Sequence, residues 1–183
     1  VATFCDAIAN GRPYEVSDPS VELELLYIDD LVEEMLSALL GEETRCGYDG
    51  LEEAGGEDFC ACRPTDRATL GEIVSLLESF RASREDLAVP DLAEGSFSKK
   101  LWSAFESYYA EGSRAYPLSP RRDWRGSFTE FLRTPERGQV SVNVSGPGVT
   151  KGNHWHRSKW ERFLVVSGEA SIRLRRVGLD ADG

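Results

Sequence analysis

The two histidines of the chain, His154 and His156, are separated by one residue, and Glu161 follows five residues after the second. On a β-strand, side chains alternate between faces, so a His-x-His pair presents both imidazoles on one face. A carboxylate beyond the next turn can complete a ligand set suited to zinc, manganese, iron or nickel. The spacing therefore predicts a divalent-metal site at His154, His156 and Glu161, with two surface histidines on a polar strand as the alternative.

Glycines frame these residues, with Gly148 before them and Gly168 after them. Gly168 is expected to allow a hairpin turn between two strands. The complete pattern, G-x5-H-x-H-x4-E-x6-G, resembles the first metal-site motif of the cupin barrels. That resemblance implies a β-barrel that binds its metal with these three side chains and with a histidine of a second motif, which would lie beyond Gly183.

A second motif lies upstream, at residues 123–130, with the sequence Asp-Trp-Arg-Gly-Ser-Phe-Thr-Glu. It resembles the D-x-R-G-x-F-x-E signature of nucleotide-deoxysugar epimerases, which are also cupins. The resemblance implies that Arg125 and Glu130 hold the nucleotide diphosphate end of the substrate. A guanidinium that forks onto phosphate oxygens is a physically sound way to recognise this group.

Residues 151–154, Lys-Gly-Asn-His, stand where those epimerases carry R-G-x-H, whose histidine abstracts a proton beside a keto group. The resemblance implies a substrate-binding role for Lys151 and gives His154 two alternative roles, metal ligand or general base. A metal-bound imidazole has no lone pair left to accept that proton. Because His156 and Glu161 complete a ligand set, we favour the ligand role, and the catalytic base is left unassigned.

The composition bounds the function. The chain has 183 residues, a formal net charge of −11 and four cysteines. A nucleic-acid partner would require a basic face that this composition does not supply. No apolar run reaches the roughly 20 residues that span a bilayer, and so few cysteines favour a reducing cytoplasm over a disulfide scaffold. Cys46, Cys60 and Cys62 could offer a second metal site, but their spacing is not a standard zinc pattern, and free thiols are the preferred interpretation.

The elements that would position both motifs are short strands. Strand-like patterns recur between Gly and Pro turns, at 127–132, 140–144, 161–166 and 170–175. This texture predicts an all-β, truncated cupin (jelly-roll) barrel over residues 122–183, after a linker at 113–121.

The preceding residues, 1–112, mix strand and helix patterns and predict an α/β segment. An apolar strand is expected at 21–28. A helix with apolar positions from Leu31 to Leu39 is expected to follow, and Asp29 or Asp30 is expected to cap it.

Residues 42–68 show little periodicity and are expected to form a loop. Residues 69–72, Thr-Leu-Gly-Glu, form a capping box and predict the start of a helix. The buried stripe of that helix is expected at Leu70, Ile73, Leu77 and Phe80. Another helix is expected at about 96–109.

Residues 25–32, Leu-Leu-Tyr-Ile-Asp-Asp-Leu-Val, resemble the late segment of an extended short-chain dehydrogenase, where a strand runs into a Y-[IV]-D-D turn and a helix. The chain has no Gly-rich dinucleotide loop and no Tyr followed four residues later by Lys, so it lacks the usual cofactor loop and reductase pair. With the segments at 125–131, 134–144 and 151–156, this order resembles the capsular polysaccharide assembling protein family. The fold class implied is an α/β C-terminal remnant of a Rossmann-type extended short-chain dehydrogenase, followed by the truncated cupin barrel. The chain therefore looks like part of a longer protein.

Members of that family are two-domain reductase/epimerases in the route to UDP-N-acetyl-L-fucosamine. For the full-length protein, the resemblance implies a cytoplasmic homodimer with zinc in the cupin. It also implies 3-epimerisation of a UDP-4-keto-2-acetamido-2,6-dideoxyhexose and NADPH-dependent C4 reduction. The metal would act as a Lewis acid at the keto oxygen. Two other interpretations stay open: a metal-dependent sugar-binding or sensing cupin without catalysis, and an inactive fragment.

Overall fold

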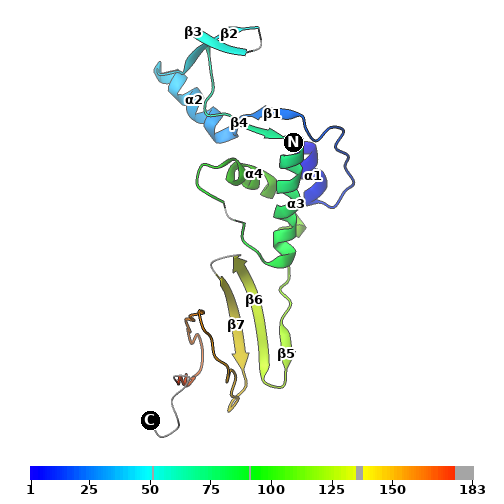
Figure 1. Cartoon of the computed structure of the whole chain (residues 1–183), viewed down its shortest axis with the longest axis vertical. Coiled ribbons are helices and arrows are strands. Elements are labelled where there is room, and N and C mark those ends of the chain that lie inside the picture. Colours follow the sequence, from blue (N-terminus) through cyan, green and yellow to red (C-terminus); the bar gives the residue numbers. More distant parts are fainter. Residues whose placement is uncertain (51, 91, 135–137, 176–183) are drawn as a thin grey trace.

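The structure is a computed structural model that describes residues 1–50, 52–90, 92–134 and 138–175. The chain is elongated (Figure 1). A hairpin of β2 (Arg45–Asp49) and β3 (Glu52–Cys60) lies at one end, and helices occupy the middle. A three-stranded sheet lies toward the other end, beside the C-terminal segment (Figure 1). The mixed α/β content agrees with the prediction.

Three helices form the core: α1 (Ala2–Ala9), α3 (Leu70–Asp86) and α4 (Phe97–Glu106). The largest fully buried side chains are Cys5, Ile73, Leu77, Phe80 and Phe105. Ile73, Leu77 and Phe80 recur at helical spacing, so α3 presents one continuous apolar stripe to its neighbours. The Phe80 ring meets Trp102 of α4 edge to face, with ring centroids 4.9 Å apart. The predicted stripe is confirmed, although Leu70 is only partly buried.

Helix α3 begins at the predicted capping box. The Thr69 hydroxyl accepts a hydrogen bond from the Glu72 amide at 3.2 Å, and the Glu72 carboxylate accepts one from the Thr69 amide at 2.8 Å. These bonds satisfy backbone donors that the first turn leaves without partners. The Thr69 amide bond also lowers the pKa of Glu72 below its usual value. Helix α4 begins similarly at Ser96, as expected.

The predicted strand at 21–28 is too long. Strand β1 covers only Glu22–Leu25 and pairs antiparallel with β4 (Asp66–Thr69) in a two-stranded sheet. Helix α2 (Ile28–Leu40) starts inside the predicted strand, with Tyr27 as its N-cap and no side-chain capping bond. The prediction that Asp29 or Asp30 caps it was therefore wrong. Both carboxylates lie in its first turn, where they face the positive end of the helix dipole.

The loop expected at 42–68 was also wrong, because β2, β3 and β4 fall within it. Strands β2 and β3 contain glycine, and their sequence did not predict strands because glycine has a low β propensity. In the structure it permits close backbone approach: a Cβ atom on Gly47 would lie 2.7 Å from the carbonyl oxygen of Gly55. The β2–β3 register also shifts between Cys46 and Gly47.

Helix α2 follows the predicted apolar spacing but buries none of its residues. Leu39 is 82% exposed, and most of the other large apolar side chains of the helix also face solvent: Ile28, Val32, Met35, Leu36 and Leu40. Within the described residues, no helix is both long and apolar enough to cross a membrane.

The sheet near the C-terminal segment has the order β5 (Arg121–Asp123), β6 (Gly126–Thr134) and β7 (Gly138–Ser145), all antiparallel. The strands expected at 127–132 and 140–144 are confirmed. The segment that precedes this sheet, the predicted linker at 113–121, is exposed, and the domain boundary itself stays a prediction.

The strands expected at 161–166 and 170–175 were wrong, because residues 146–175 contain no helix or strand. A strand needs a partner for its backbone groups, and neither edge of the β5–β6–β7 sheet pairs with this segment. Leu164 and Val166 are 86% and 89% exposed as a result. The sheets are open, so the predicted barrel is not confirmed over the described residues.

Two backbone hydrogen bonds attach this sheet to the helical core. The Val89 amide donates to the Arg133 carbonyl, and the Arg133 amide donates to the Leu87 carbonyl, both at 2.8 Å. Leu87 directly follows α3, so the end of that helix holds the far end of β6.

Gly126 opens β6 with a φ of +130°. A Cβ atom there would lie 2.0 Å from the Val144 carbonyl oxygen on β7. Only glycine can therefore stand at this position without displacing one of the two strands.

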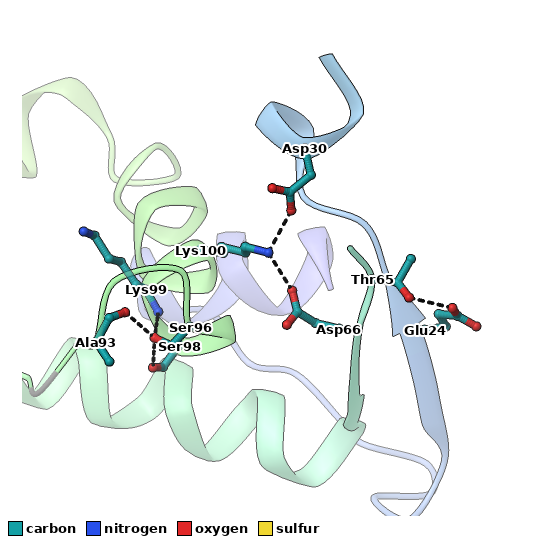
Figure 2. Close-up of polar contacts among 9 residues, drawn as sticks. All are labelled: Glu24, Asp30, Thr65, Asp66, Ala93, Ser96, Ser98, Lys99 and Lys100. Carbon is teal, nitrogen blue, oxygen red and sulfur yellow. Dashed lines mark hydrogen bonds and ion pairs between the residues drawn. The ribbon is translucent and has the colours of Figure 1, made fainter. Parts of the chain in front are cut away.

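An ion-pair network ties α2 and β4 to α4 (Figure 2). The Lys100 ammonium lies 2.8 Å from a carboxylate oxygen of Asp30 and 3.2 Å from one of Asp66. The Lys100 side chain is only 13% exposed, so solvent screens these contacts less than ordinary surface pairs. Hydrogen bonding to Asp30 is the main cause that raises the Lys100 pKa.

We predict that Lys100→Met lowers the free energy of unfolding by about 1–3 kcal/mol, because two mostly buried carboxylates lose their shared donor. Urea denaturation followed by circular dichroism measures this. Lys99→Met is the matched control, since the ion-pair partner of Lys99 among the described residues is the exposed Glu94. It should cost less than about 0.5 kcal/mol. Equal losses of unfolding free energy in the two variants would show that the Lys100 ion pairs do not stabilise the fold.

The pH dependence checks the same interaction. Folding raises the Lys100 pKa above the value of about 10.4 expected in an unfolded chain. The stabilisation is therefore fully present below about pH 10 and is lost as the pH rises through the folded pKa. The stability gap between the wild type and Lys100→Met should narrow as the pH rises through that alkaline range.

We also predict that Gly126→Ala disrupts the β5–β6 turn, because the new methyl group overlaps the Val144 carbonyl. Gly138→Ala is the control, since Gly138 has a φ of +98° but no atom within 4 Å of the added Cβ. Gly126→Ala should destabilise the sheet by about 1–3 kcal/mol more than the control. Hydrogen exchange of β6 and β7 amides measures this difference, and equal protection in both variants would show that the contact is harmless.

Candidate functional site

An open groove of about 350 Å³ lies at the turn between β5 and β6 and beside β7. Its charged lining consists of four cations and one acid: Arg121, Arg122, Arg125, Lys151 and Asp123. The chain as a whole carries a net charge of −11. This groove is therefore a locally positive region of an acidic protein, and it is suited to anions.

Arg125 is held by Asp123 two residues earlier. One Asp123 oxygen accepts the Arg125 backbone amide at 2.8 Å. The other accepts the side-chain Nε at 3.0 Å and Nη2 at 2.5 Å. The bond to the Arg125 side chain is the main cause that lowers the Asp123 pKa below its usual value. Asp123 is therefore a carboxylate that fixes one edge of the guanidinium.

Lys151 reaches the groove from the segment after β7. Its ammonium donates to the Asn143 side-chain oxygen at 2.6 Å and to the Val144 carbonyl at 3.1 Å. Strand pairing places Asn143 opposite Phe128 and Val144 opposite Ser127, so both acceptors stand beside the start of β6. The structure thus brings two of the predicted substrate-binding residues, Arg125 and Lys151, to one groove.

Glu130, the third predicted substrate-binding residue, is not among the residues that line this groove. It lies further along β6, where its carboxylate accepts a hydrogen bond from the Arg133 Nε at 2.9 Å. Its side chain is 13% exposed. In the structure, Glu130 therefore pairs with Arg133 and stands apart from Arg125 and Lys151.

The predicted metal ligands lie near one another but are not arranged as a ligand set. The His154 and His156 rings meet edge to face with centroids 4.8 Å apart, and His156 Nε2 is 3.8 Å from Glu161 Oε1. The same Glu161 oxygen lies 3.1 Å from the Lys159 ammonium, which is the main cause that lowers the Glu161 pKa. No three or more metal-binding side chains converge within residues 1–50, 52–90, 92–134 and 138–175.

The donor types nevertheless suit a divalent ion, since imidazole nitrogen and carboxylate oxygen are both zinc ligands. The strand that would place both imidazoles on one face is not formed, because residues 146–175 have no regular structure. The assignment of His154, His156 and Glu161 as ligands, and the alternative role of His154 as a base, stay predictions.

The alternative metal site at Cys46, Cys60 and Cys62 is not supported by the positions of these cysteines. All four cysteines are free thiols. Cys46 is buried on β2, whereas Cys60 at the end of β3 is exposed and Cys62 is partly exposed. They take no part in a metal-binding group among the described residues.

The sequence interpretation missed Arg121, Arg122 and Asn143 as groove residues. The Arg121-Arg122 pair is visible in the sequence, but no local pattern places it in a groove with Arg125 and Lys151. Asn143 could not be found locally, because only the pairing of β7 with β6 brings it to the groove.

Comparison with known proteins shows relatives along most of the chain. Residues 121–182 match the family model of the polysaccharide biosynthesis C-terminal domain. The chain is also 33% identical, over 177 residues, to a UDP-2-acetamido-2,6-beta-L-arabino-hexul-4-ose reductase of Pseudomonas aeruginosa. That match covers 97% of this chain and 44% of the reductase.

Solved structures agree. The capsular polysaccharide assembling protein CapF of Staphylococcus aureus is 45% identical, with a TM-score of 0.73 over 86% of this chain and 40% of its own. A structure of CapF with the inhibitor 3-isopropenyl-tropolone is also 45% identical, with a TM-score of 0.74 over 86% and 42% of the two chains. The chain thus spans less than half the length of these relatives. The resemblance indicated by the motifs is confirmed: this chain is related to the capsular polysaccharide assembling protein family.

Proposed function

We propose that the groove between β5, β6 and Lys151 binds the diphosphate of a UDP-sugar, within an enzyme of capsular polysaccharide biosynthesis. One observation carries this proposal. The cations of residues 121–125 and of Lys151 converge on one groove in a chain with a net charge of −11. Arginine can bind phosphate oxygens through two parallel hydrogen bonds, and lysine adds a point charge.

The relatives support the substrate class. The Pseudomonas aeruginosa relative is, by its name, a reductase of UDP-2-acetamido-2,6-beta-L-arabino-hexul-4-ose. For the full-length protein we propose 3-epimerisation of a UDP-4-keto-2-acetamido-2,6-dideoxyhexose and NADPH-dependent C4 reduction, in a cytoplasmic homodimer. No residue of the 183 is assigned to NADPH, because neither the Gly-rich loop nor the Tyr-x-x-x-Lys pair is present.

We further propose that His154, His156 and Glu161 hold a divalent ion, with zinc as the first choice. Such an ion would polarise the keto oxygen of the sugar as a Lewis acid. The chain's own contribution in the groove is orientation. Arg125 and Lys151 would hold the diphosphate, so that the attached sugar stays near the segment that carries the histidines.

A sugar-binding or sensing protein without catalysis is the second candidate function. The position of Glu130 favours it, since the carboxylate expected at the nucleotide end is paired with Arg133 instead. A binding protein for a free sugar would have no need of Arg125, so the two candidates differ in their ligand.

We predict that UDP binds the chain and a free 6-deoxyhexose does not, as measured by isothermal titration calorimetry. Arg125→Gln should weaken UDP binding by about 10- to 100-fold, because a charge-assisted hydrogen bond to phosphate is lost. Arg67→Gln removes the same charge from the exposed side of β4 and serves as the control. It should change the affinity by less than about twofold.

Binding of the free sugar without binding of UDP would favour the sensing protein. Equal affinity losses in Arg125→Gln and Arg67→Gln would show that only net charge matters, and would contradict the groove as the site.

The metal proposal predicts that cobalt(II), as a spectroscopic substitute for zinc, binds with visible absorption bands of a nitrogen and oxygen site. His156→Ala should abolish these bands, because one of the three proposed ligands is lost. The double variant Cys60→Ser/Cys62→Ser tests the alternative ligands and should leave the bands unchanged. Bands that survive His156→Ala but vanish in the cysteine variant would assign the metal to the thiols.

A further inference from the structure

Asp123 makes contact with both the backbone and the side chain of Arg125. Its Oδ1 accepts the Arg125 amide at 2.8 Å, which closes a local turn between β5 and β6. Its Oδ2 accepts Nε and Nη2 of the same arginine, at 3.0 and 2.5 Å. One oxygen of the Asp123 carboxylate is thus bonded to the backbone, and the other is bonded to the guanidinium.

The hydrogen bonds from Arg125 to Asp123 use only one edge of the guanidinium. A guanidinium has five N–H donors in a planar fork, and Asp123 engages those of the Nε and Nη2 edge. The Nη1 end is left available for a ligand. Because arginine loses considerable rotamer freedom when it binds, a side chain that is already oriented loses less of it.

Simple charge counting predicts the opposite effect for this residue. Among the residues that the structure describes, Asp123 is the only acid that lines the groove, and it would repel an incoming phosphate. A groove that required only positive potential would bind phosphate better without it. The two effects of Asp123, orientation and repulsion, therefore have opposite signs and can be separated.

We propose that Asp123 is a positioning residue for phosphate recognition: it fixes Arg125 by the Nε and Nη2 edge, so that the Nη1 end meets the diphosphate. The orientation outweighs the repulsion. This inference rests on the proposed function, because it assigns Asp123 a part in UDP binding.

The variant Asp123→Asn tests the hydrogen bonds between the Asp123 side chain and the Arg125 guanidinium. The asparagine oxygen can still accept the Arg125 amide and keep the turn, while its NH2 group faces the guanidinium donors and cannot accept from them. UDP affinity should fall by about 3- to 10-fold, although a negative charge has been removed. Asp49→Asn, an exposed residue of the distant β2, makes the same charge change and should leave the affinity unchanged.

A second measurement needs no ligand. In the wild type, nitrogen-15 NMR should show a slowly exchanging Arg125 Nε–H resonance, which Asp123→Asn should bring into fast exchange with water. Equal thermal stability of the two proteins would exclude simple unfolding as the cause.

The outcomes separate the two proposals. If the wild type binds UDP and Asp123→Asn binds it equally or more tightly, Asp123 only repels phosphate and the positioning role is refuted. If the wild type does not bind UDP, the proposed function fails and this inference fails with it. Weaker UDP binding together with the loss of the protected Nε–H resonance establishes the role.

Discussion

Helix α3 buries Ile73, Leu77 and Phe80 almost completely, and α1, α4 and β4 contact that helix. Helices α1 and α4 pack against its apolar stripe. Strand β4 leads directly into its capping box, so the β1–β4 pair is fixed at its start. Its C-terminal end runs into Leu87 and Val89, which bind the backbone of Arg133 on β6. Burial of this stripe thus helps to determine where the β1–β4 and β5–β6–β7 sheets lie, because fully burying each large apolar side chain contributes about 1.5–3 kcal/mol.

The candidate site depends on helix α3 indirectly, through strand β6. Helix α3 holds one end of β6, and the groove forms at the other end, where β5 turns into β6 at Gly126. The absence of a side chain at Gly126 lets β7 approach, and β7 then supplies the acceptors that fix Lys151. The cations gather against a negative net charge, so they create a local field that differs in sign from that of the whole chain.

In the predicted metal motif, the sequence supplies suitable ligands, but the structure does not arrange them as a ligand set. Its residue types determine what it could bind, because imidazole and carboxylate are suitable ligands whatever the fold. Convergence on one ion requires a strand that fixes the side-chain directions, and residues 146–175 contain none in this structure. Glu161 accordingly pairs with Lys159, which lies two residues earlier in the sequence. Local attraction between neighbouring side chains decides this contact.

The sequence by itself determined the features that depend on neighbours a few residues apart. The capping box at Thr69 and Glu72, the stripe of α3 and the strands β6 and β7 were all predictable, because hydrogen bonds within one turn and side-chain periodicity are local. The D-x-R-G motif likewise identified Arg125. Only the tertiary structure decided which distant groups meet: Asn143 beside Phe128 of β6, and Asp30 with Lys100. It also decided that the Gly-containing β2 and β3 pair as strands and that the residues predicted as strands at 161–166 and 170–175 do not. Strand pairing joins backbone groups that are far apart in the chain, and no local pattern specifies the partner.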